Sequence, residues 1–187
     1  MNDLTYIAFY KPYGILSQFT SNNPNETLGN FNLPKDVYPV GRLDKDSEGL
    51  ILLSNDGKFI EKLLNPLFDK EKIYWVQVEK IPDESSLDIL RKGGITIQDY
   101  QTKPASIKIL NPQPLFAERA PPVRTRLSVP TCWIEVIISE GKNRQVRRMT
   151  ANIGHPTLRL IRMQVGKYRL GELAPGQWIK IRKSDIL

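Results

Sequence analysis

The segment Gly41–Leu50 holds side chains that could do chemistry, and five of them are charged: Asp44, Asp46, Glu48, Arg42 and Lys45. Carboxylates serve enzymes as nucleophiles or as proton donors and acceptors. Three acids in one loop repel each other, so a buried Asp44 needs a neighbouring cation to remain ionised. An arginine suits this task, because it stays charged and binds a carboxylate through two nitrogens. The same residues could equally form a structural ion pair, since such networks also perturb carboxylates.

Residue spacing excludes several other kinds of site. The segment Gly41–Leu50, called the acid-rich segment below, resembles the start of a calcium-binding loop from Asp44 onward. The twelfth position of such a loop would be Asn55, where a bidentate glutamate is needed. No P-loop, GxGxxG or GxSxG motif occurs. His155 lies in a Gly-His-Pro turn, which favours a structural role over triad chemistry. Cys132 and His155 are the only residues of their types, so we expect no metal and no cofactor.

The elements that must position the acid-rich segment follow from apolar periodicity. Apolar or alternating runs predict seven strands: Leu4–Tyr10, Ile51–Leu53, Lys72–Glu79, Ala105–Leu110, Thr131–Ser139, Leu158–Val165 and Trp178–Arg182. Helical spacing and end signals predict three helices: Lys58–Leu64, Asp83–Lys92 and Arg144–Ile153. Because these elements interleave without a regular βαβ period, the predicted fold class is α+β, with a mixed, mostly antiparallel sheet flanked by helices.

Two of these elements carry further candidates. In Lys72–Glu79, a period of two places Tyr74 on one face with Val76 and Val78. The helix predicted over Arg144–Ile153 has an apolar stripe, and its other side presents three arginines: Arg144, Arg147 and Arg148.

Charge is distributed unevenly along the chain. Residues 1–93 contain 11 basic and 14 acidic side chains, whereas residues 94–187 contain 16 basic and 6 acidic ones. The basic residues are densest between Gly141 and Gly171, where no acid occurs. Such a region attracts a polyanion, most plausibly nucleic acid. A solvated charged face is the alternative, because basic surfaces are common.

The segment Asn111–Pro130 contains five prolines and three arginines, one of which is Arg124. We expect a long loop or protruding hairpin that could contact a partner. A spacer is the alternative, since Pro-rich segments often serve as spacers.

Length and composition indicate one soluble domain, residues 1–187, with two sub-lobes. No run approaches the ~18 apolar residues of a membrane span. The N-terminus has no signal-peptide pattern, so we expect a cytoplasmic protein. We also expect a monomer.

Gly41–Leu50, followed by Leu-Ser-Asn-Asp-Gly, resembles the central signature of bacterial rRNA pseudouridine synthases of the branch that contains small-subunit rRNA synthase A. Four other motifs of the family occur in order: Lys11–Gly14, Lys72–Tyr74, Glu140–Met149, and Leu160–Arg162 with Gly166. Many members carry an S4 RNA-binding module before the catalytic domain. Here the opening motif begins at Lys11, so we expect no such module.

The resemblance implies a pseudouridine synthase catalytic fold with a central RNA-binding cleft. It places the catalytic aspartate at Asp44, its basic partner at Arg147, and the tyrosine that stacks on the target uracil at Tyr74. Arg42 matches a position that can fill the space left by a flipped nucleotide. The substrate is then expected to be a stem-loop of 23S rRNA, and further RNA contacts are expected from six residues: Lys11, Lys142, Arg144, Arg148, Arg162 and Arg124.

Two other functions compete with this one. A non-catalytic RNA-binding or ribosome-assembly protein would explain the basic half, but gives no reason for Asp44 beside Arg42 or for Tyr74 on an apolar strand face. An RNA methyltransferase would need a glycine-rich cofactor loop, which the sequence lacks.

Overall fold

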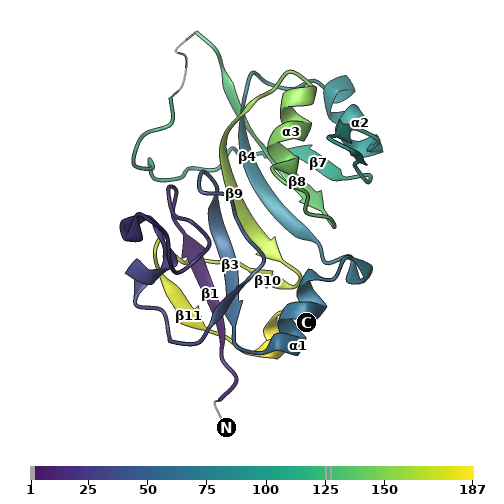
Figure 1. The fold of residues 1–187 in the computed structure, drawn as a ribbon. Helices are drawn as coiled ribbons and strands as arrows, with labels where there is room; N and C mark the ends of the chain where they lie inside the picture. Colours follow the sequence, from purple (N-terminus) through teal and green to yellow (C-terminus); the bar gives the residue numbers. More distant parts are fainter. Residues whose placement is uncertain (1–2, 125, 127) are drawn as a thin grey trace. The chain divides into compact units, whose positions relative to one another are not determined.

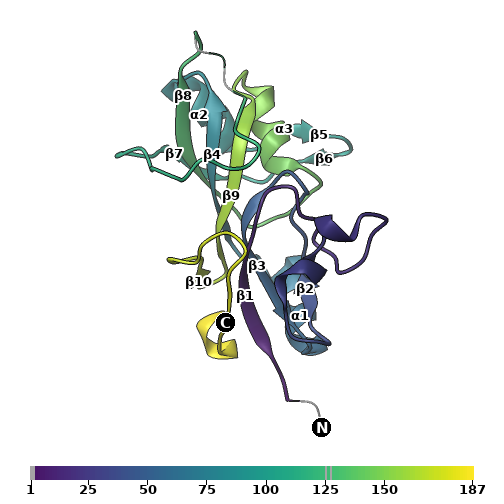
Figure 2. The ribbon, with the colours of Figure 1, turned by 90° about the vertical axis from the view of Figure 1, so that its left-hand side faces the viewer.

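The computed structural model describes residues 3–124, 126 and 128–187, and the chain divides into two compact units. The first unit comprises residues 1–70 and 161–187, and the second comprises residues 71–160. The ribbon of each unit can be followed in Figure 1 and, from the side, in Figure 2.

The first unit is built on strands β1 (Tyr6–Lys11) and β3 (Glu48–Ser54), which pair antiparallel along their length. On its other side β1 pairs antiparallel with β11 (Trp178–Lys180). The end of β9 (Thr157–Val165) pairs parallel with the start of β3. The remaining elements of this unit are short: β2 (Tyr38–Val40), β10 (Tyr168–Arg169), helix α1 (Gly57–Leu64) and four 3-10 turns, Pro24–Glu26, Leu28–Phe31, Pro66–Phe68 and Lys183–Asp185.

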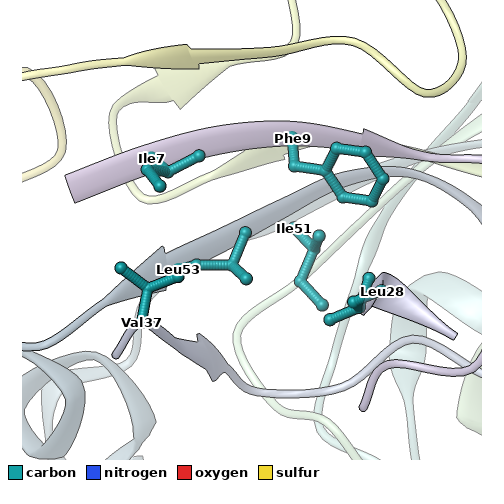
Figure 3. Packing of buried hydrophobic residues seen from close by; sticks show 6 residues of the cluster. All are labelled: Ile7, Phe9, Leu28, Val37, Ile51 and Leu53. Atoms are coloured by element: carbon teal, nitrogen blue, oxygen red, sulfur yellow. The ribbon is translucent and has the colours of Figure 1, made fainter. Parts of the chain in front are cut away.

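A hydrophobic cluster fills the space beside β1 and β3. Figure 3 shows its six buried members side by side: Ile7, Phe9, Leu28, Val37, Ile51 and Leu53. Every residue of β3 is buried, which explains its continuous apolar run. The last three residues of the acid-rich segment, Glu48–Leu50, belong to this strand. The segment is therefore continuous with a fully buried element.

The second unit is built on an antiparallel pair, β4 (Lys72–Glu79) and β8 (Thr131–Ile138), matched along all eight residues. Strand β7 (Ser106–Ile109) pairs antiparallel with the other edge of β8. Helices α2 (Glu84–Lys92) and α3 (Gln145–Asn152) lie beside these strands (Figure 1). Two short strands, β5 (Thr96–Ile97) and β6 (Tyr100–Gln101), form a separate hairpin.

The predicted α+β class with a mostly antiparallel sheet is confirmed, and the seven strands and three helices occur where the periodicity placed them. Some boundaries differ. Pairing between β1 and β3 starts β3 at Glu48, inside the acid-rich segment, and extends β1 to Lys11, one residue beyond the predicted strand. Arg144 precedes α3 as a left-handed residue with φ of 51°. Strands β2, β5, β6 and β10 were not predicted, because two or three residues show no period.

Within the described residues, no helix is long and apolar enough to cross a membrane. The Pro-rich segment Asn111–Pro130 contains no helix or strand among its described residues, as predicted. Figure 1 shows the first part of this segment leading away from β7.

Asp56 ties the start of α1 to the C-terminal turn of the first unit. Its side chain caps the helix by accepting from the Phe59 N–H at 3.1 Å, and it accepts from Tyr6 Oη at 2.7 Å and Lys183 Nζ at 2.8 Å. The hydrogen bonds from Lys183 and Tyr6 lower the pKa of this carboxyl to about 2. The carboxylate therefore stabilises the fold in its charged form.

We expect Asp56→Ala to lower the free energy of unfolding by about 2 to 3 kcal/mol at neutral pH, because a helix cap and two charge-assisted hydrogen bonds are lost. Since the pKa is depressed in the folded state, this contribution is complete above the ordinary value of 3.8 and is lost as the pH falls toward 2. Urea unfolding between pH 7 and pH 2.5 measures it, with Glu61→Gln on the exposed side of α1 as control. A loss that is the same at both ends of this range would contradict the assignment.

Candidate active site

The backbone of the acid-rich segment is held by the strand and turn that open the chain. The Ser17 hydroxyl donates to the Leu43 carbonyl at 2.7 Å and accepts from the Leu43 N–H at 2.9 Å. The Gly14 N–H donates to the Lys45 carbonyl at 2.8 Å. Asp44 lies between these two anchors, half-buried, and its own carbonyl accepts from the Ser47 N–H at 3.0 Å. Asp44 therefore sits in a backbone that is fixed on both sides.

Lys11 supplies a buried cation beneath this segment. Its side chain is completely buried, and Nζ donates to the carbonyls of Pro12 at 3.0 Å, Ile15 at 2.6 Å and Lys45 at 3.5 Å. Three carbonyl oxygens match the three N–H bonds of an ammonium group. Lys11 thus joins the opening turn to the residue that follows Asp44.

The charges around Lys11 come from the acid-rich segment and from β9. Burial lowers the pKa of the Lys11 ammonium to about 7, and the negative charges of Glu48, Asp46 and Asp44 oppose this change, whereas the positive charge of Arg162 adds to it. All three carboxylates of the segment are therefore close enough to interact with one buried cation. A cation therefore lies near Asp44 within the first unit, whereas the pairing of Asp44 with Arg147 stays a prediction.

Arg162 fixes the end of the segment from β9. Its side chain is 4% exposed, and Nε donates to the Leu50 carbonyl at 2.7 Å. Gly49, at φ of +101°, lies so close to the backbone of Arg162 that a Cβ added to it would be 2.4 Å from the Arg162 carbonyl oxygen. Only glycine fits this contact, because a side chain would collide with backbone. The second glycine of the motif thus permits the parallel pairing of β3 with β9.

Tyr74 and Arg147, the other two predicted catalytic residues, belong to the second unit. Tyr74 lies on the buried face of β4 with Val76 and Val78, as its period predicted, and is 7% exposed. Arg147 lies on α3, half-buried, and its Nη1 donates to the Thr157 carbonyl at 3.5 Å. Both side chains therefore emerge from regular elements.

Glu140 organises the turn that leads into α3, and sequence reasoning assigned it no role. Its carboxylate accepts from the Tyr100 hydroxyl, the Lys103 N–H and Gln145 Nε2. Gln145 Oε1 in turn accepts from the Lys142 N–H at 3.0 Å. The glutamate and glutamine, five residues apart in the third motif, were the available signal. Together they fix the start of the helix that carries Arg147.

The residues expected to contact RNA differ in exposure. Lys11 and Arg162 are buried and bonded inside the first unit, which argues against direct contact with RNA. Arg148 is half-buried, and its Nη2 donates to Asn143 Oδ1 at 3.3 Å. The other four are exposed: Arg42, Arg124, Lys142 and Arg144. Lys142 Nζ also lies 4.1 Å from the centre of the Tyr100 ring.

His155 has the structural place that its turn indicated. It is buried, and Nδ1 lies 3.0 Å from the Glu79 carbonyl oxygen. Among the residues that the structure describes, no group of three or more histidine, cysteine or acidic side chains could hold a metal ion.

The lowered pKa of Lys11 predicts a pH-dependent stability. The folded state releases this proton near pH 7, whereas the unfolded state keeps it up to about 10.5, so the free energy of unfolding rises with pH across this window. Lys11→Met should remove that rise. Chemical denaturation between pH 6.5 and pH 10 measures the slope, and Lys62→Met, at an exposed site on α1, should keep it. Equal slopes in wild type and Lys11→Met would refute the prediction.

Glu140→Gln should loosen the start of α3, because an amide cannot accept all three donated hydrogen bonds. We expect a loss of about 1 to 3 kcal/mol in the free energy of unfolding. Amide hydrogen exchange over Gln145–Asn152 should become faster than in wild type. The matched control is Glu118→Gln, an exposed site in the same unit. Unchanged exchange in α3 would show that Glu140 does not hold the helix.

Comparison with known proteins identifies the family. Residues 5–152 match the family model of RNA pseudouridylate synthases. The chain is 52% identical over 174 residues to Ribosomal large subunit pseudouridine synthase E of Xanthomonas campestris, covering 92% of each protein. It is 51% identical over 176 residues to the protein of that name from Vibrio parahaemolyticus, covering 94% of this chain and 73% of the relative. The wording of the motifs and the Pro-rich insertion predict a resemblance to synthase E, and both of these relatives carry that name.

A solved structure agrees with this assignment. The crystal structure of a pseudouridylate synthase matches the fold with a TM-score of 0.81 at 27% identity, over 100% of this chain and 74% of that one. The expected catalytic fold is therefore confirmed, and the chain belongs to the RNA pseudouridylate synthase family.

Proposed function

We propose that this protein converts a uridine in a stem-loop of 23S rRNA to pseudouridine, with Asp44 as the catalytic carboxylate. The observation that carries the proposal is the identity of about one half, over more than nine tenths of the chain, with relatives named as large-subunit rRNA pseudouridine synthases E. The proposal places the protein in the cytoplasm, as a monomer.

The isomerisation of uridine to pseudouridine can be carried out by amino-acid side chains alone. The N1–C1′ bond of uridine breaks, the base turns, and a C5–C1′ bond forms, while the proton on C5 leaves and N1 gains one. Atoms and electrons balance without an oxidant, a reductant or a group donor. An enzyme for this isomerisation requires a carboxylate, a way to hold the loosened base, and contacts to the RNA backbone.

Asp44 is proposed for the chemistry because its position is fixed while its side chain stays half-exposed. Its backbone is anchored at Leu43 and Lys45, and the buried charge of Lys11 interacts with its carboxylate. A negatively charged carboxylate can attack the sugar or the ring, or it can remove a sugar proton. Both routes are served by an aspartate held firmly beside a buried cation.

The second unit supplies the proposed base-holding groups. A base in a duplex must leave the stack before it can react, at a cost of a few kcal/mol. We assign the stacking on the uracil to Tyr74, whose ring is carried by the long β4–β8 pair. Arg147 is assigned as the basic partner of Asp44, and Arg42 as the residue that fills the space left in the stack.

Contacts to phosphate are assigned to the exposed basic residues. Lys142 and Arg144 lie on the turn before α3, and Arg124 lies in the Pro-rich segment. Each would add a salt-dependent contribution to affinity without sequence preference. Lys11 and Arg162 are not assigned such contacts, since both are buried within the first unit.

Asp44→Asn should abolish turnover and leave RNA affinity within about twofold, because the charge of one side chain is removed without changing its size. Release of tritium from 23S rRNA labelled at uracil C5 measures turnover, and filter binding measures affinity. Asp69→Asn, on the surface of the same unit, is the matched control. Release by Asp44→Asn at the wild-type rate would remove Asp44 from the chemistry. No release by the wild-type protein would instead favour a non-catalytic RNA-binding role.

A further inference from the structure

Leu115 stands out on the surface of the second unit, because its side chain is fully exposed, at 100%. Exposed leucines are common, but this one lies at the start of the Pro-rich segment, between two residues that are firmly bound to the sheet. An apolar side chain that a fixed backbone holds in water does not stabilise the free protein. The residues around Leu115 indicate which kind of partner it could bind.

The anchor before Leu115 is Gln113. Its Oε1 accepts from the Trp133 N–H at 2.6 Å, and its Nε2 donates to the carbonyls of Trp133, at 3.2 Å, and Leu110. The side-chain amide thus binds the backbone of β8 from both its oxygen and its nitrogen. The chain is fixed to the sheet two residues before Leu115.

The anchor after Leu115 is Phe116. Its ring packs against two tryptophans of the sheet, with centroid distances of 5.8 Å to Trp75 and 5.1 Å to Trp133. Arg159 lies over the same ring at 5.4 Å and donates from Nη1 to the Ala117 carbonyl at 2.9 Å. Arg159 is itself buried, and the Phe116 ring is half-buried against it and the two tryptophans.

The rest of the Pro-rich segment is basic, which indicates a negatively charged partner. Beyond the clamp, the described residues include Arg119, Arg124 and Arg126, with Glu118 as the one acidic residue in 111–130. A protein partner would need a wide apolar face, which a single leucine does not provide. A base-paired helix needs only one apolar side chain, because proteins that bend DNA unstack a base step by inserting a single residue such as leucine. Arginines beside such a side chain can bind the phosphates.

We propose that Leu115 is a wedge that enters between neighbouring bases of the substrate RNA helix, with the clamps at Gln113 and Phe116 holding it rigid and the arginines of the segment binding the flanking backbone. This inference rests on the proposed function, since it takes the RNA substrate as the partner. A wedge lowers the energy needed to open the helix. It should therefore matter for a paired target and not for one that is already unpaired.

The test compares two fragments of 23S rRNA that contain the uridine converted by the wild-type protein. In one the uridine is paired within a helix, and in the other the opposing nucleotides are deleted. Leu115→Ala should lower kcat/KM on the paired fragment by about tenfold and change it less than twofold on the unpaired fragment, because opening a base step costs a few kcal/mol. Leu115→Met should keep most of the activity. Leu67→Ala, at a leucine that is 86% exposed in the first unit, should behave as wild type on both.

A second measurement reads helix opening without turnover. A paired 23S rRNA stem with 2-aminopurine beside the target position should brighten when wild-type protein binds, and less so with Leu115→Ala. Equal activity of Leu115→Ala and wild type on the paired fragment, or equal losses on both fragments, would overturn the wedge. Equal fluorescence changes would do the same, even for an RNA that is not converted. Absence of turnover by the wild-type protein on both fragments would count against the proposed function itself.

Discussion

One buried ammonium group organises the part of the first unit that carries the acid-rich segment. Lys11 donates to carbonyls on both sides of the opening turn and to the carbonyl of Lys45, so it fixes the residue next to Asp44. Burying a charge is costly unless hydrogen bonds and opposite charges compensate. Here three carbonyls and the three carboxylates of the segment offset part of that cost, and the pKa of Lys11 stays lowered, at about 7. The acidic side chains, which would otherwise repel each other, thereby become part of a defined structure.

The second unit uses the opposite arrangement, with one carboxylate collecting several donors. Glu140 gathers the Tyr100 hydroxyl, the Lys103 N–H and the Gln145 amide, and so fixes the left-handed turn at Arg144 from which α3 starts. In both units a single charged group, bonded on all sides, holds a short motif of the family in one conformation. Asp44 and Arg147, two of the residues proposed for chemistry, are carried by these motifs and are not themselves the anchors.

Sequence reasoning predicted elements with strong local signals. The alternation in Lys72–Glu79 predicted both β4 and the buried face of Tyr74, and Asp83 with Gly93 predicted the ends of α2. It could not predict what depends on pairing between distant residues. Lys11 was expected beyond the end of the first strand and among the RNA contacts, but its pairing opposite Gly49 extends β1, and its side chain is buried. The roles of Glu140 and of Gln113 were missed because several of their partners lie far along the chain: Tyr100, Lys103 and Trp133.

The central claim is that Asp44, in its anchored segment, isomerises one uridine of 23S rRNA. The most direct measurement is a map of pseudouridines in rRNA from cells that lack this gene and carry either the wild-type gene or the Asp44→Asn variant. The account predicts that one 23S rRNA pseudouridine disappears with the gene, returns with the wild-type protein and does not return with the variant. A complete pattern in the cells without the gene, or full restoration by Asp44→Asn, would contradict it.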